Sequence, residues 1–217
     1  MKRTFLAIVA IFAIALSLTS CGGGDSKSSS KETHFALGEY VTILQNAVAI
    51  DKELKGKLET IKDSKELEKL IAEAQSEMEK YKAAVNSMTE QDMGKDAFIE
   101  IAEGAPFILE TPLKFGKSLP YSDAIWVKLE GEIGVNGEVT LPEGKQNLVA
   151  NLNVLDKEGN VLYTKKNFAT FKGTKNEEGT SVVAADAKAQ VGEYIVIKEK
   201  AVEDWGKAAK LLLVIAE

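Results

Sequence analysis

The fold of the C-terminal half of this chain is decided by residues 124–133, which read AIWVKLEGEI. From Trp126 or Val127 onward, apolar and polar side chains alternate, and this is the period of a half-buried β-strand. The same alternation returns at 148–155. A polar turn sequence then leads to a second apolar segment at 161–164, so we expect these two segments to pair as a β-hairpin.

Further strand-like segments continue to the C-terminus. They lie at residues 107–110, 168–172, 180–184, 194–198 and 210–215. Turn signals recur about every ten residues and no helical crossover rhythm separates the strands, which favours an all-β sandwich over a parallel sheet. The pattern is similar to immunoglobulin-like and fibronectin-like modules in general, and this likeness assigns no functional residue.

Two helices are expected before the strands. Apolar residues recur with a helical period from Leu37 to Ile61 and again from Leu67 to Met88. Asp63 precedes the second segment as an N-cap, with Glu66 three residues later. Because so short a connection forces neighbouring helices to be antiparallel, the sequence predicts a helical hairpin. The fold class is therefore α+β, a helical hairpin over 34–93 followed by an immunoglobulin-like β-sandwich over 94–217.

The N-terminus carries a different signal. Lys2 and Arg3 precede an apolar run from Phe5 to Leu16, which is too short to span a bilayer. A branched apolar residue and two small residues then lead directly to the only cysteine; these four positions are Leu18, Thr19, Ser20 and Cys21. The stretch resembles the signal peptide and lipobox of bacterial lipoprotein precursors.

The resemblance implies that the chain is cleaved before Cys21, which then carries lipid. Residues 1–20 would be the signal peptide, and residues 21–33, rich in Gly and Ser, a flexible tether. Two or three acyl chains hold a protein at a membrane stably, whereas one binds only marginally. Gly22 stands where an Asp would favour inner-membrane retention in well-studied Gram-negative sorting, so we expect the outer membrane, at its periplasmic face or the cell surface.

Charge and cysteine usage exclude several classes of function. Removing residues 1–20 takes away Lys2 and Arg3 and no acidic residue, so the formal charge falls from −6 to −8. An acidic surface repels phosphate backbones, which argues against nucleic acid as a partner. With Cys21 acylated no thiol remains for a disulfide or a thiolate metal site. We therefore expect no cofactor and no metal.

Catalytic signals are weak. His34 is the only histidine, lies in a polar junction and has no second His or Cys to share a metal or catalytic site. Acidic turns at 156–160 and 176–179 suggest calcium, but neither has the ligand spacing of an EF-hand loop. We interpret both as hairpin turns, in which Gly supplies the backbone conformation that the turn needs.

Aromatic side chains are the remaining recognition candidates. Trp126 lies within an alternating strand, so we expect it to be buried in the sandwich. Trp205 lies in a polar segment, 203–207, that reads as a loop. It is a ligand-binding candidate together with Tyr121 if exposed, and a structural residue if it folds back over the sandwich edge, which we favour.

These observations predict a non-enzymatic, lipid-anchored envelope protein that binds or scaffolds another envelope protein, a peptide or a glycan. The alternative is a carboxylate-dependent hydrolase acting on an envelope or extracellular glycan, with its two acids in the loops of the β-half. A third hypothesis, oligomerisation through the helices, predicts an apolar stripe left exposed on their outer side.

Overall fold

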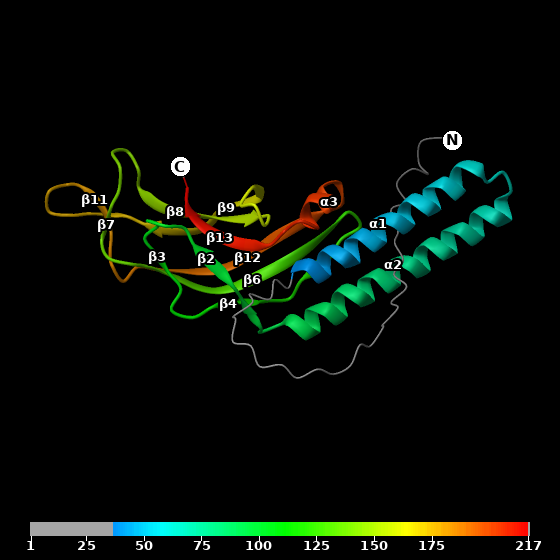
Figure 1. Ribbon diagram of the computed structural model, residues 1–217, viewed down its shortest axis with the longest axis horizontal. Coiled ribbons are helices and arrows are strands. Elements are labelled where there is room, and N and C mark those ends of the chain that lie inside the picture. Colours follow the sequence, from blue (N-terminus) through cyan, green and yellow to red (C-terminus); the bar gives the residue numbers. More distant parts are fainter. Residues whose placement is uncertain (1–36, 217) are drawn as a thin grey trace.

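The computed structural model describes residues 37–216 (Figure 1). Two long helices precede a part that is rich in antiparallel sheets packed like a β-sandwich, which confirms the predicted α+β class. The helices are α1 (Leu37–Thr60), α2 (Ser64–Asp92) and the short α3 (Val202–Trp205), with a 3-10 turn, η1 (Glu199–Ala201), before α3.

The strands vary from two to twelve residues. In chain order they are β1 (Asp96–Ala97), β2 (Ile99–Ile101), β3 (Phe107–Ile108), β4 (Leu113–Phe115), β5 (Leu119–Pro120), β6 (Ala124–Val135), β7 (Val139–Thr140), β8 (Asn147–Leu155), β9 (Val161–Lys172), β10 (Thr174–Lys175), β11 (Ser181–Val183), β12 (Lys188–Lys198) and β13 (Lys210–Ile215).

Three sheets are formed. In sheet A the order is β1-β4-β6-β12, and β3 and β5 also pair with β6. Sheet B has the order β2-β13-β8-β9, and the small sheet C has the order β10-β11-β7. All pairings are antiparallel except that of β2 with β13, which is parallel. The predicted hairpin of 148–155 with 161–164 is confirmed as β8 and β9.

Strand β6 is the centre of sheet A, because every other strand of that sheet except β1 pairs with it. Ile125, Val127 and Leu129 on one face of β6 are fully buried. They belong to one hydrophobic cluster that also contains inward residues of β8, β12 and β13. Sheets A and B therefore face one another across this cluster, which is the core of the sandwich.

The helix pair shares that core at one end only. The first half of α1 and the second half of α2 contribute to the same cluster, for example Leu44 and Val85. Farther out, Leu54, Leu70 and Ala74 form a separate small cluster with only Ile50, Leu58 and Ile61 packed against it. Figure 1 accordingly shows both helices extending away from the sandwich.

The predicted start of the second helix is confirmed. Asp63 is the N-cap of α2, and its carboxylate accepts hydrogen bonds from the backbone N–H groups of Lys65 at 2.7 Å and Glu66 at 3.3 Å. A cap of this kind satisfies N–H groups that have no partner within the helix. The cap fixes where α2 begins after the turn from α1.

Some strand predictions were too short, and one loop was wrong. The predicted strand at 210–215 agrees with β13, whereas 194–198 is only the second half of β12 and 168–172 only the end of β9. Residues 203–207 are not a loop throughout, because α3 covers Val202–Trp205. Two-residue strands such as β1 and β5 are too short to show a period in the sequence.

The predictions about the signal peptide, the tether and His34 fall on residues 1–36. Leu18, Thr19, Ser20 and Cys21 therefore lie outside the described residues. Within 37–216 no helix combines the length and the apolar character needed to cross a bilayer.

The separate outer cluster makes a prediction about local stability. Leu54→Ala should remove about 2–5 kcal/mol of packing from the far ends of α1 and α2, because it leaves a cavity in a cluster with few other members. Hydrogen exchange measured by mass spectrometry should accelerate in residues 50–75 and stay slow in β6 and β12. Equal acceleration in β6 would show instead that the helices and the sandwich unfold as one unit.

Candidate functional site

Three aromatic side chains meet at the surface of sheet A. Tyr121 is 44% exposed and Trp126 is 37% exposed, and their ring centroids are 5.0 Å apart. Tyr194 lies on the other side of Trp126, with ring centroids 5.7 Å apart. We call Tyr121, Trp126 and Tyr194 the aromatic patch. The plane of the Trp126 ring is inclined by 46° to that of Tyr121 and by 58° to that of Tyr194, so the three rings do not form one flat surface.

The sheet register sets the positions of these rings. Trp126 pairs with Leu119 of β5 on one side and with Val196 of β12 on the other. Tyr194, two residues from Val196 on β12, projects from the same face because side chains alternate along a strand. Tyr121 follows β5 directly, and its N–H donates to the carbonyl oxygen of Ala124 at 2.8 Å. This turn holds Tyr121 over Trp126.

Charged groups border the patch. Lys128 lies over the ring of Tyr194, with its ammonium 6.0 Å from the centroid, and forms an ion pair with Glu130. The hydrogen bond with Glu130 raises the pKa of Lys128 above its ordinary value. A second ion pair, between Lys165 of β9 and Glu193 of β12 at 2.6 Å, lies on the other face of β12, because Glu193 is in register with the buried Leu129. The aromatic centre is therefore bordered by one pair of opposite charges, Lys128 and Glu130.

The patch lies where the helices meet the sandwich. Tyr81 of α2 is fully buried, and its hydroxyl donates to the carbonyl oxygen of Ala124 at 3.4 Å. Burial raises the pKa of the Tyr81 phenol above its usual value, so the group remains a neutral donor. Ala124 also accepts from Tyr121, so one carbonyl connects α2 to the turn that carries the patch.

A buried polar cluster lies at the base of the helix pair. It contains the hydroxyl groups of Tyr40, Thr89 and Ser118 and the carboxylate of Asp92. Burial raises the pKa of Tyr40, while the nearby Ser118 and Thr89 hydroxyls act in the opposite direction. None of the three hydroxyl oxygens makes a hydrogen bond of ordinary geometry within residues 37–216. The joint between the helices and the sandwich therefore contains a group of buried polar side chains.

The prediction that Trp126 is buried was wrong. Ile125 and Val127 both face the core, so Trp126 between them must face outward. Because Trp126 and Val127 are adjacent and both apolar, the sequence alone did not decide which of them faces the core. In the structure Val127 faces the core and Trp126 faces solvent, where it forms part of the aromatic patch.

Trp205 has the structural position that we favoured. It is only 3% exposed, and its ring packs against Tyr163 of β9 with centroids 5.2 Å apart. The short helix α3 brings it into the main core beside α1. The exposed indole that ligand binding would require is absent at this position, and only Tyr121 of the two predicted binding residues lies on the surface.

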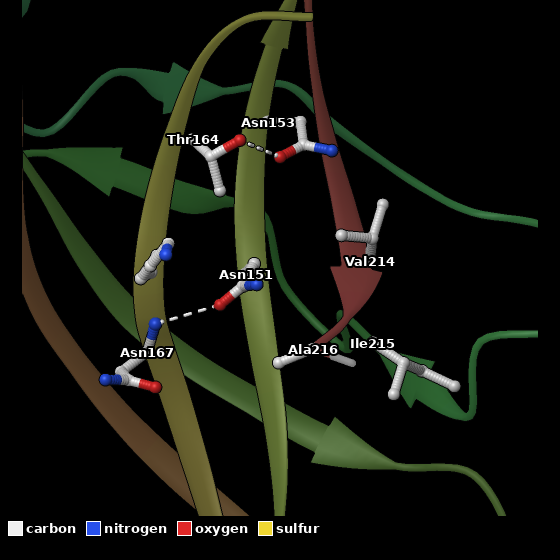
Figure 2. A pocket seen from close by; sticks show the side chains of 8 residues that line it. Asn151, Asn153, Thr164, Asn167, Val214, Ile215 and Ala216 are labelled. Atoms are coloured by element: carbon white, nitrogen blue, oxygen red, sulfur yellow. Dashed lines mark hydrogen bonds between the residues drawn. The ribbon is translucent and has the colours of Figure 1, made fainter.

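A second surface feature was not anticipated from the sequence. A groove of about 580 Å³ crosses the outer face of sheet B and is lined by side chains of β8, β9 and β13 (Figure 2). Asn151 and Asn153 on β8 belong to the predicted alternation, but the groove also needs β9 and β13. β13 lies about sixty residues farther along the chain than β8, so no local pattern indicates it.

Both acidic turns are hairpin turns, as predicted. The carboxylate of Asp156 accepts hydrogen bonds from the backbone N–H and the side-chain amide of Asn160, both at 2.8 Å. The side-chain bond is the main reason that the pKa of Asp156 is lowered. Asn176 caps its own turn in the same way, accepting from Glu178 and Thr180.

Metal ligands do not gather in the part of the chain that the structure describes. No group of three or more His, Cys, Asp or Glu side chains is placed there to hold one ion. Comparison of the chain with protein-family models, curated proteins and solved structures finds no match. Function must therefore be argued from the surface of this molecule alone.

The two tryptophans give a direct test of the described surface. In the variant Trp205→Phe the remaining Trp126 should be quenched strongly by acrylamide, because its indole is partly open to solvent. In Trp126→Phe the remaining Trp205 should be shielded and emit at shorter wavelength. Stern–Volmer plots of both variants make the comparison, and equal quenching would contradict the assignment of faces.

Proposed function

We propose that this chain is a lipid-anchored cell-envelope protein of the outer membrane, and that it binds a protein or peptide partner of the envelope without catalysing a reaction. The observation that carries the proposal is the aromatic patch, in which Tyr121 and Trp126 are exposed side by side. Large apolar rings that face water at adjacent positions are typical of interaction sites.

The surroundings of the patch support a protein partner. Binding hot spots are enriched in Trp and Tyr and lie at the centre of an interface, inside a polar rim that excludes water. Here the rings are bordered by the Lys128–Glu130 ion pair. Because both charges of this pair are already partnered, the rim contributes register and selectivity more than affinity.

Two finer features of the fold belong to the same proposal. The connection of α1 to α2 spans only residues 61–63, and the helices contact one another, which supports an antiparallel hairpin. Among the long strands, β6 pairs with β12 and β8 pairs with β13. Immunoglobulin domains interlock strands B with E and C with F in this way, which supports the immunoglobulin-like assignment.

Anchoring through Cys21 explains how such a module is held without a positive surface. Three residues separate the end of the proposed tether, at residue 33, from the start of α1 at Leu37, which is buried in the main core. The lipid would therefore connect to the sandwich end of the molecule. The far ends of the helices would remain free to extend from the membrane surface.

The two described grooves offer little for the hydrolase alternative. The groove on sheet B has no carboxylate among its lining residues, and a second groove near sheet C has only Glu143. Glycoside hydrolysis needs two facing acids.

The oligomer hypothesis requires an apolar stripe exposed on the outer side of the helices. No strongly exposed large apolar side chain lies within α1 or α2, so this requirement is not met.

Lipidation is tested with Cys21→Ser. The unaltered protein should incorporate radiolabelled palmitate and partition into the detergent phase of a Triton X-114 extract. The variant should do neither, because the only thiol is lost. A parent protein found in the aqueous phase without label would contradict the anchor and leave the patch to be tested separately.

Partner binding is tested by photo-crosslinking in intact cells. Benzoylphenylalanine in place of Tyr121 should give one crosslinked product of defined mass, and adding Trp126→Ala should abolish it. Phe98→Ala is the matched control, since Phe98 is 47% exposed and lies outside the patch. Loss of the product with Phe98→Ala, or its persistence with Trp126→Ala, would contradict docking through the patch.

A further inference from the structure

The groove on sheet B is lined by polar side chains that are held in place by hydrogen bonds. Figure 2 shows Asn151 and Asn153 of β8 flanked by Thr164 and Asn167 of β9 on one side and by β13 on the other. We call this the amide groove; its lining residues are Asn151, Asn153, Thr164, Lys166, Asn167, Val214, Ile215 and Ala216. It lies on a different sheet from the aromatic patch, so the inference below does not rest on the proposed function.

The side-chain amides of Asn151 and Asn153 are each held in one orientation. The hydroxyl of Thr164 donates to Asn153 Oδ1 at 2.8 Å, and the backbone N–H of Asn167 donates to Asn151 Oδ1 at 2.9 Å. The Nδ2 groups of both asparagines have no hydrogen-bond partner among residues 37–216. An amide whose oxygen is engaged presents its NH₂ as a donor. The groove therefore presents two oriented donors.

The backbone of β9 is distorted at this point. Ala150 pairs with Ala169 while Leu152 pairs with Lys165, so β9 contains two more residues than β8 between these pairs. Asn167 lies in this bulge with φ 52°, the only non-glycine residue of the described chain with positive φ. Bulges and strained residues of this kind concentrate at binding sites. Here the distortion orients the backbone N–H of Asn167 toward Asn151 Oδ1.

The charge of the groove opposes that of the chain. The whole sequence has 33 acidic residues, yet none of them lines this groove, and the one ionisable lining residue is Lys166. Two amide donors and an ammonium group together favour a ligand with a negative charge and several acceptor oxygens. A carboxylate is the simplest group that meets this description.

The ligand must also match a groove that presents acceptors as well as donors, because Asn167 also lines it and an amide oxygen with one hydrogen bond can accept a second. A sugar hydroxyl can donate and accept at once, whereas each polar group of a peptide backbone does only one of the two. Val214 and the 45% exposed Ile215 add an apolar border suited to the C–H face of a sugar ring. We propose that the amide groove binds a carboxylate-bearing sugar, such as a uronic acid unit of an acidic glycan.

The test titrates the full-length protein in detergent micelles with digalacturonic acid, with neutral galactobiose as the matched sugar. Calorimetry should show saturable binding of the acid only, weakened by added salt. The side-chain amide signals of Asn151 and Asn153 should shift in nitrogen–proton NMR spectra. No binding of the acid, or equal binding of galactobiose, would overturn the proposal.

A pair of charge-matched variants isolates the donors. Asn153→Asp keeps an oxygen for the Thr164 hydroxyl but replaces the NH₂ donor with a second carboxylate oxygen, so affinity should fall about tenfold or more. Asn147→Asp adds the same charge on the same strand about 20 Å from Asn153 and should change affinity less than twofold. Equal effects of the two variants would show that only net charge matters and would overturn the site.

Lys166→Gln provides a second variant on an exposed side chain, and it should also weaken binding of the acid.

A tripeptide with a free C-terminal carboxylate is the competing ligand. If the tripeptide binds at least as tightly as digalacturonic acid, the assignment to a sugar is wrong. Weaker binding of the tripeptide supports it.

Discussion

Burial of Ile125, Val127 and Leu129 is the constraint on which the rest of the structure depends. Because side chains alternate along a strand, fixing these three residues in the core places Trp126, Lys128 and Glu130 on the outer face. β6 also pairs with β3, β4, β5 and β12, so its phase is transmitted to most of sheet A. A slip of one residue would bury the charges of Lys128 and Glu130 and expose three core side chains, which costs far more than exposing one indole.

The periodic parts of this fold could be predicted from the sequence, and the parts decided by distant residues could not. The helices, the Asp63 cap, the β8–β9 hairpin and β13 all follow from local patterns and turn residues. The phase at Trp126 could not be read locally, because Trp126 and Val127 are both apolar and the choice between them is made by β5 and β12. Trp205 was correctly favoured as structural, yet its short helix was missed because four residues show no period.

The candidate sites also combine residues that the local sequence indicates with residues that only the fold brings together. Tyr121 was predicted from the sequence as a candidate binding residue, but its neighbours in the patch come from a strand phase and from β12, seventy residues away. The amide groove joins alternate residues of β8 to a bulge in β9 and to β13. The two outer faces of the sandwich thus differ in chemistry, with aromatic rings on sheet A and oriented amide donors on sheet B.

The most direct test of the placement of β6 measures how fast cysteines introduced along the strand react with a thiol reagent. In a Cys21→Ser background, cysteine is placed one position at a time at residues 125–130 and labelled with a maleimide under native conditions, with a denatured sample as reference. The account predicts rapid labelling at 126, 128 and 130 and strong protection at 125, 127 and 129. The opposite phase, or no alternation at all, would contradict the placement of β6 and with it the aromatic patch.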